Sequence, residues 1–169
     1  MRINVTNRVA QRITYSRRTL GTACAVATLV FAGQSAAAPF SAALDIKNER
    51  FAVQVAAQNE DRRQGLSGRD PLKADEGMVF VWPNAAPRRF HMKDMKFPID
   101  IIFLDDRGRV LNVAERAPVC GDADPCPQYY STGPAQSVVE IQAGGAKRLQ
   151  LQVGDTVTIP DNWTAVAKP

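Results

Sequence analysis

The stretch Phe90 to Asp105, FHMKDMKFPIDIIFLD, decides the fold of this chain. Its second half, Ile99–Leu104, is a short apolar run typical of a strand that is buried on both faces. The residues that follow, 105–108 (DDRG), suit a hairpin turn, because glycine adopts the positive φ that such turns require. We therefore expect a return strand over 109–114 that pairs antiparallel with the apolar run.

Other short strands are predicted on both sides of this hairpin. Phe51, Val53 and Val55 alternate with other residues in the two-residue period of a strand. A short helix is expected between Asn59, a favoured N-cap residue, and Gly65. The remaining expected strands cover 78–82, 88–92, 136–142, 149–153 and 156–159. Together they predict a mainly β, single-domain antiparallel β-sandwich or barrel-like fold with one short helix.

The first 37 residues have the composition of a secretory leader. Residues 1–18 hold five arginines and no acid, and the apolar stretch Leu20–Gly33 precedes small residues that suit cleavage after Ala37. A membrane anchor would need about 20 apolar residues, so a cleaved signal peptide over 1–37 is favoured, with no membrane span afterwards. Residues 16–20 (SRRTL) resemble a twin-arginine export motif, and the Sec route stays open.

This layout predicts a periplasmic or secreted bacterial protein with a flexible spacer over 38–49 and a domain over 50–162. Five of the 21 basic residues lie in the leader, so 16 basic residues face 17 acidic ones in the rest of the chain. This balance, without a basic stripe interleaved with aromatic residues, argues against nucleic-acid binding. Cys120 and Cys126 remain after cleavage, and an even pair in an exported chain predicts a disulfide rather than half of a metal site.

An ordered set of motifs carries a family resemblance. The segments are 62–70 (RRQGLSGRD), 76–81 (EGMVFV), 90–105, 138–144 (VVEIQAG) and 153–155 (VGD). They resemble the DUF192 (UPF0127) family, whose members usually read GLM-x-R, GMLF, FWMKNT-x-IPLDIIF, LE-x-x-AG and GD. The resemblance implies a compact β-rich sandwich with a short helix, often exported, for which no biochemical activity is agreed. His91 departs from the usual Trp, and Asp94-Met95 from the usual Asn-Thr.

Two carboxylates within apolar strands, Asp100 and Glu140, are the sharpest chemical clues. A buried, unpaired carboxylate costs several kcal/mol, so Asp100 is expected to pair with Arg69 or Lys93, in a buried ion pair or in a ligand-binding cleft. If their strands are neighbours, Asp100 and Glu140 could act together as acid and base or hold a cation. That alternative predicts a hydrolase or lyase acting on an envelope glycan.

A second alternative is a copper site, because the imidazole of His91 and the thioethers of Met92 and Met95 suit Cu(I). Met92 is equally expected to fill the core. No nucleophile–base pair, phosphate-binding loop or dinucleotide motif is present, and no cofactor is predicted. The favoured function is therefore a binding or accessory module of the envelope, with a small molecule, a glycan or an envelope protein as partner. Its candidate polar cluster is Arg69, His91, Lys93, Asp100 and Glu140.

Overall fold

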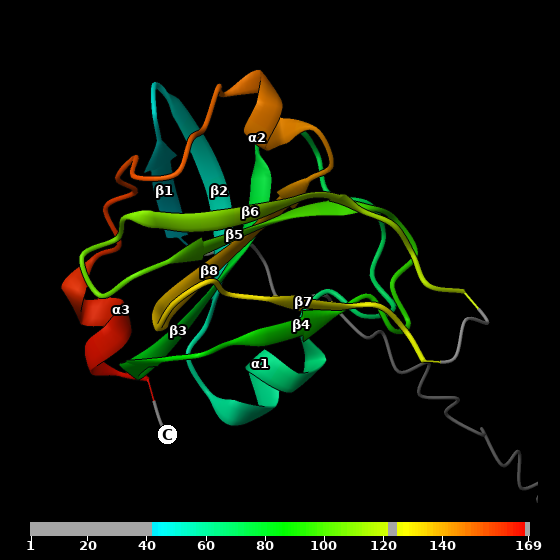
Figure 1. Ribbon diagram of the computed structural model, residues 1–169, viewed down its shortest axis with the longest axis horizontal. Helices are drawn as coiled ribbons and strands as arrows, with labels where there is room; N and C mark the ends of the chain where they lie inside the picture. The colour runs from blue at the N-terminus through cyan, green and yellow to red at the C-terminus, as the bar shows by residue number, and fades with distance from the viewer. Residues whose placement is uncertain (1–41, 122–124, 168–169) are drawn as a thin grey trace, which may run out of the picture. The chain divides into compact units, whose positions relative to one another are not determined.

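A six-stranded sheet with the strand order β1-β2-β3-β8-β5-β6 organises the chain (Figure 1). The computed structural model describes residues 42–121 and 125–167. In chain order the elements are β1 (Ala42–Ile46), β2 (Glu49–Ala56), α1 (Asn59–Gln64), β3 (Glu76–Ala86), β4 (Arg89–His91), β5 (Ile99–Leu104), β6 (Val110–Ala117), β7 (Gln128–Tyr130), β8 (Ala135–Gln142), α2 (Gly145–Arg148) and α3 (Asp161–Ala165). A second, small sheet pairs β4 with β7 antiparallel.

The mainly β prediction is confirmed, but the large sheet is mixed. Strands β2 and β3 run parallel, whereas the other neighbours in this sheet are antiparallel. A parallel pair needs a long crossover, and α1 with the loop after it supplies that crossover here. The strand order is linear, so the sheet keeps two edges, β1 and β6, and does not close into a barrel.

The large sheet is buried on both faces. One face, here called the C-terminal face, packs Phe51, Val79 and Ile102 against residues of the segment 149–167. The other, here called the small-sheet face, packs a second cluster that includes Met78 and Phe103 against Phe90 of β4 and Tyr129 of β7. In Figure 1, α2 lies above the large sheet, while α1 and the small sheet lie below it. Burial on both faces explains why all of Ile99–Leu104 is buried.

The N-terminal boundary of the domain differs from the expectation. Residues 42–46, expected within a flexible spacer, form β1 and pair with β2 across a tight turn at Lys47-Asn48. Leu44 and Ile46 point into the C-terminal core, and this two-residue alternation over only five residues is a weak sequence signal. The expected signal peptide, 1–37, lies outside the described residues. No helix in the described part is long and apolar enough to cross a membrane.

The strands expected over 149–153 and 156–159 are wrong. The chain there is an extended loop that follows α2 and precedes α3, two helices that the sequence pattern did not indicate. The loop is held against the β5–β6 turn: Val157 N–H donates to Gly108 O, and Val110 N–H donates to Asp155 O. Gly108 has a φ of 73°, and a Cβ there would lie 2.2 Å from Val157 O, so this close approach requires glycine.

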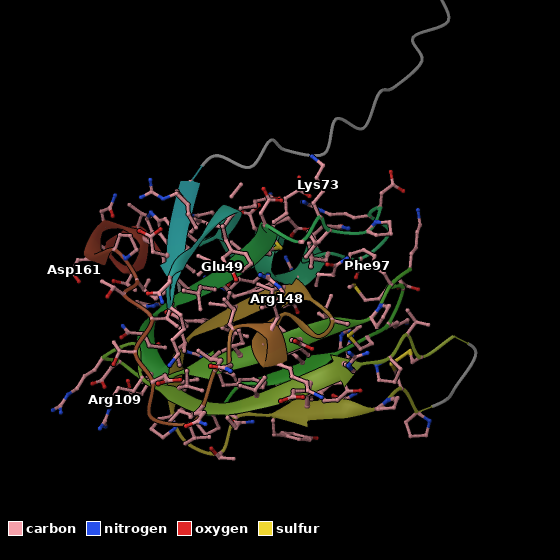
Figure 2. All side chains as sticks on the ribbon, turned by 90° about the horizontal axis from the view of Figure 1, so that it is seen from above. Glu49, Lys73, Phe97, Arg109, Arg148 and Asp161 are labelled. Atoms are coloured by element: carbon pink, nitrogen blue, oxygen red, sulfur yellow. A yellow bond between two sulfur atoms is a disulfide. The ribbon has the colours of Figure 1, made fainter. Side chains whose placement is uncertain are left out.

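Helix α2 is tied to distant segments of the chain. The Arg148 guanidinium forms an ion pair with Glu49 at the start of β2, and the two side chains lie close together in Figure 2. Its Nη2 also donates to Ala74 O at 3.2 Å. These contacts hold the loop after β8 over the end of the sheet, and this placement decides the environment of Asp100.

Candidate ligand-binding site

Asp100 is a fully buried carboxylate whose partners are backbone amides rather than basic side chains. Its Oδ1 accepts hydrogen bonds from the N–H groups of Arg116 at 2.7 Å and Gly144 at 3.0 Å. Its Oδ2 accepts a hydrogen bond from the N–H of Ala146 at 2.8 Å. The expected pairing with Arg69 or Lys93 is therefore wrong, because three backbone donors already occupy the carboxylate.

The local backbone brings these donors to Asp100. The Gly144 and Ala146 amides belong to the start of α2, whose N-cap, Gly144, has no side chain with which to satisfy them. Asp100 replaces the missing cap from β5, and a negative charge also suits the positive end of a helix. Gly144 has a φ of 87°, and the Arg116 guanidinium lies over it. Asp100 thus has a structural role: it joins β5, β6 and α2.

Glu140 points the opposite way. In the β5–β8 register, Asp100 pairs with Ile141 and Ile101 pairs with Glu140. The two acids are therefore offset by one residue along the strands. Since successive side chains alternate between faces, Asp100 projects to the C-terminal face and Glu140 to the small-sheet face. The two strands are neighbours, so the condition set for a shared pocket is met. The shared acid–base pocket for a glycan hydrolase or lyase is wrong, because the sheet separates the two carboxyl groups.

The Glu140 carboxyl group is buried without a partner. Its side chain is 5 % exposed and lies between Met78 and Ile101 on the neighbouring strands. Among the described residues, no hydrogen bond or ion pair reaches it, and its carboxyl oxygens keep some solvent contact, since the fully enclosed side-chain atom without a partner there is Gln54 Oε1. Burial raises the pKa of Glu140 to about 8, so the group is a neutral carboxylic acid at neutral pH, with one O–H to donate.

A cavity of about 240 Å³ opens onto Glu140. Residues 62–67 of α1 and the loop after it form one side, and residues 89–91 of β4 form another. The remaining lining residues are Phe80, Trp82, Met95 and Glu140. We call this space the α1–β4 cavity. It combines apolar walls with a few polar groups, the composition typical of small-molecule sites.

One arginine of this cavity, Arg62, is held in place by hydrogen bonds to the backbone. Arg62 Nη1 donates to the carbonyls of Ala57 at 2.7 Å and Val81 at 2.8 Å, and its guanidinium lies 5.4 Å from the centre of the Trp82 ring. Arg88 contacts the same ring at 4.1 Å. Burial lowers the pKa of Arg62 and of Arg88, and the charge of Arg62 lowers that of Arg88 further. The Trp82 ring is therefore in contact with two guanidinium groups.

The other residues of the predicted polar cluster do not all line the α1–β4 cavity. His91 is exposed and lines the α1–β4 cavity, and its Nδ1 accepts a 3.3 Å hydrogen bond from the Lys93 N–H. Lys93 is exposed and does not line the cavity. Arg69 is half-buried outside the cavity, and burial lowers its pKa. Of the five residues of the predicted polar cluster, only His91 and Glu140 thus line one space.

The candidate copper ligands are also separated. Met95 lines the α1–β4 cavity with His91, but Met92 is 1 % exposed and belongs to the core of the small-sheet face. Within residues 42–121 and 125–167, no group of three or more His, Cys, Asp or Glu side chains is placed to share a metal ion. The Met92 thioether is used in packing, so the copper alternative stays a prediction for His91 and Met95, which line the same cavity.

The predicted disulfide between Cys120 and Cys126 is confirmed, with a Cα–Cα distance of 5.5 Å. Cys126 packs against the core of the small-sheet face and comes just before β7. Because β7 pairs with β4, the disulfide supports the strand that carries Arg89 and His91 into the cavity wall.

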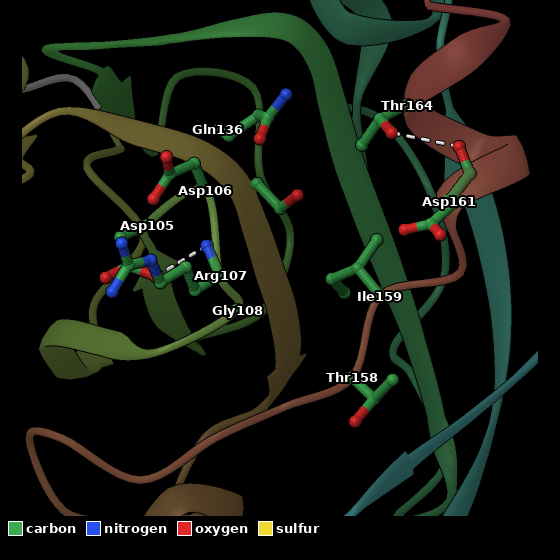
Figure 3. A pocket seen from close by; sticks show the side chains of 10 residues that line it. Asp105, Asp106, Arg107, Gly108, Gln136, Thr158, Ile159, Asp161 and Thr164 are labelled. Atoms are coloured by element: carbon green, nitrogen blue, oxygen red, sulfur yellow. Dashed lines mark hydrogen bonds between the residues drawn. The ribbon is translucent and has the colours of Figure 1, made fainter.

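A second cavity, of about 310 Å³, lies between the β5–β6 turn and α3 (Figure 3). Its acidic groups include Asp105, which already accepts hydrogen bonds from the N–H groups of Arg107 and Arg109. Thr164 Oγ1 is also engaged and donates to Asp161 O at 2.9 Å. Ser137 also lines this cavity, is 2 % exposed and has no side-chain hydrogen bond within the described residues, but no carboxyl group among the described lining residues is buried as Glu140 is.

Sequence reasoning identified Glu140 and His91 but missed the cationic part of the site. Arg62 and Arg63 stand inside the motif RRQGLSGRD, and Arg89 precedes Phe90 in the opening stretch. Their clustering depends on α1 and β4 meeting over β8, which no local pattern reveals. The aromatic residues Trp82 and Phe90 also line the cavity.

Comparisons with known proteins agree on a family without a known activity. The family model of DUF192, described as "Uncharacterized ACR", matches residues 42–159. A protein of unknown function from Novosphingobium aromaticivorans DSM 12444 is 29% identical, with a TM-score of 0.61, over 69% of this chain and 82% of that chain. A Sinorhizobium meliloti 1021 protein, described as a candidate transcription regulator, is 28% identical with a TM-score of 0.61, over 69% of this chain and 89% of that chain. No curated protein matches this chain. The motifs, the fold and the family match lead to one conclusion: the chain belongs to the DUF192 family.

Proposed function

We propose that this protein is an exported binding module that holds a small ligand in the α1–β4 cavity. The observation that supports this most is the Glu140 carboxyl group, which lines the cavity, is 5 % exposed and has no partner among the described residues. Buried polar groups are nearly always hydrogen-bonded, so an unpartnered one that faces a cavity calls for a ligand or a water. A cavity of about 240 Å³ suits a small ligand rather than a large one.

Binding is favoured over catalysis because the lining residues do not form a catalytic pair. Ser67 Oγ donates to Lys93 O, and His91 Nδ1 accepts from Lys93 N–H, so the hydroxyl and the imidazole do not bond to each other. Nucleophilic catalysis needs such a bond. Glycoside hydrolysis needs a second carboxyl group within about 10 Å on the same side, and Asp100 projects from the other face of the sheet.

The disulfide Cys120–Cys126 supports placing this module outside the cytoplasm, since disulfides persist in oxidising compartments. Together with the basic and apolar leader over 1–37, it favours the periplasm or the exterior of the cell.

Ligand screening tests the proposal. A library of small metabolites is added to the purified protein, and binding is measured by thermal shift and confirmed by NMR. A Met95→Trp variant blocks the cavity, because Met95 is a half-buried lining residue and tryptophan is larger. Val153→Trp is the matched control, because Val153 is 70% exposed and lies outside the cavity.

Compounds that bind the wild type and the control but lose affinity for Met95→Trp support the proposal. If no compound of a broad library binds, or if every hit binds Met95→Trp as well as the wild type, the cavity is not a ligand site.

A further inference from the structure

Basic residues outnumber acidic ones in the described lining of the α1–β4 cavity. Three arginines line the α1–β4 cavity, and Glu140 is the only acidic residue in its described lining. The charge of Arg63 is offset by an ion pair with Glu60, with a nitrogen–oxygen distance of 2.5 Å. Arg89 is exposed and makes no side-chain interaction within the described part of the chain. The cavity mouth is therefore positive, and such a field raises the local concentration of anions.

The groups that face Glu140 add no other negative charge. Helix α1 contributes Arg62 and Arg63, and β4 contributes Arg89 and His91. The neighbouring strands β3 and β5 place apolar side chains beside it, Met78 and Ile101. A cation in this cavity would meet three arginines, and the one carboxyl group among the described lining residues, that of Glu140, is held uncharged by burial.

The remaining wall is aromatic. Phe80 and Phe90 meet edge to face, with ring centroids 5.0 Å apart, and Trp82 meets Phe90 in the same way at 6.3 Å. Such rings provide apolar contact area for a small flat body. The cavity thus offers three chemically distinct parts: an apolar wall, a nearly buried acid that can donate a hydrogen bond, and exposed positive charge.

From this arrangement, and resting on the function proposed above, we propose that the ligand is a small organic acid. Its apolar, preferably aromatic, body lies against Phe80, Trp82 and Phe90. Its anionic group accepts a hydrogen bond from the Glu140 carboxyl group and is attracted by Arg89. An acid O–H that donates to an anion is a charge-assisted hydrogen bond, which is about twice as strong as a neutral one.

Three probes with one body and different charges test this ligand class. Benzoate, benzamide and benzylammonium are anionic, neutral and cationic at about pH 6.5, and calorimetry measures the binding of each to the purified protein. Benzoate should bind at least about tenfold more tightly than benzamide, the ratio expected for one hydrogen bond to a charged group. Benzylammonium should bind more weakly than both.

Two variants assign the effect to the named groups. Arg89→Gln should lower benzoate affinity about threefold to fivefold and leave benzamide affinity unchanged, as expected for an exposed charge pair. Arg107→Gln is the matched control, because Arg107 is exposed and lines the other cavity.

In the wild type, benzoate affinity should fall about tenfold per pH unit above about pH 8, because an ionised Glu140 no longer donates a hydrogen bond and repels the anion. Glu140→Gln, which keeps an N–H donor without titrating, should show no such fall.

The outcomes separate this inference from the proposed function. Equal affinity for the three probes, or a preference for benzylammonium, overturns the organic-acid inference. So does an absence of benzoate binding when library compounds still bind and are still blocked by Met95→Trp, and in that case the cavity remains a ligand site. An absence of binding by the probes and by the whole library removes both.

Discussion

Each face of the large sheet buries one carboxyl group, and the two groups differ in their hydrogen-bonding partners. On the C-terminal face, Asp100 accepts three backbone hydrogen bonds and lines neither of the two cavities described above. On the small-sheet face, Glu140 has no partner among the described residues and opens onto the α1–β4 cavity. The two groups lie on adjacent strands, one residue apart in register.

The difference shows that burial of an acid does not by itself identify a site. Asp100 has all its hydrogen-bonding partners within the fold, so its burial stabilises the junction of β5, β6 and α2. The described residues supply no partner for Glu140, and burial keeps the group uncharged. A carboxyl group without an internal partner, at the wall of a cavity, is the one that remains available to a ligand.

The largest expected effect comes from removing the Asp100 carboxylate. Asp100→Ala leaves three backbone N–H groups without an acceptor in a buried place, which should destabilise the fold by about 4 kcal/mol or more. Asp100→Asn keeps the shape and one acceptor and should cost less. Urea unfolding measures both. The exposed neighbour Asp106 provides the control, since Asp106→Ala should change stability by less than about 0.5 kcal/mol. A stable Asp100→Ala protein would contradict the structural role.

Glu140→Gln, in contrast, should increase the free energy of unfolding at neutral pH. The unfolded chain loses the Glu140 proton near pH 4.5, but the folded protein keeps it until about pH 8, so this group lowers stability as the pH rises between these values. The variant should therefore gain about 3 kcal/mol relative to the wild type between pH 4 and pH 7, from 1.36 kcal/mol per pH unit. Unfolding curves at both pH values measure the gain. A difference between the two proteins that does not change with pH would mean that Glu140 is not buried in its neutral form.

Loss of the disulfide should affect one face more than the other. Replacing Cys120 and Cys126 by serine removes a small loop constraint worth about 2 kcal/mol. Because Cys126 precedes β7, which pairs with β4, hydrogen exchange should accelerate at Arg89–His91. Exchange at the amides of Gly144 and Ala146, which Asp100 holds, should stay slow. Equal acceleration at both places would show that the two faces are not independent.

The smallest effect on stability is expected at Arg89. Its side chain is exposed and makes no interaction with the described residues, so Arg89→Gln should change the free energy of unfolding by less than about 0.5 kcal/mol. Thermal unfolding measures this, with Arg107→Gln as the control. A large destabilisation would assign Arg89 a structural role and weaken its assignment to ligand attraction.

Local patterns were sufficient to predict five of the six strands of the large sheet. The apolar run of β5 was predicted at its observed bounds, and β2 and β8 within one or two residues, because burial on one or both faces leaves a clear pattern. The disulfide followed from the cysteine count in an exported chain. Strand β1 was missed because it is short, and α2 was missed because its cap comes from Asp100, on a distant strand.

The candidate site was predictable only in part, for a geometric reason. The sequence identified Asp100 and Glu140 as unusual and allowed their strands to be neighbours, but it could not give the register. A shift of one residue places a side chain on the other face of a sheet, and this shift separates the two acids. In the same way, Arg62 and Arg89 line one cavity with Glu140 only because α1 and β4 meet beside the sheet.

The most direct test of this account is the ionisation of Glu140 itself. Glutamate carboxyl groups labelled with ¹³C can be followed by NMR from about pH 3 to pH 10, and the Glu140→Gln variant identifies the resonance of residue 140. We expect this carboxyl group to titrate near pH 8, far above its usual value of 4.5, and its midpoint to rise when benzoate is bound. A midpoint near 4.5, with or without benzoate, would mean that Glu140 is a solvated or paired carboxylate and would contradict the proposed site.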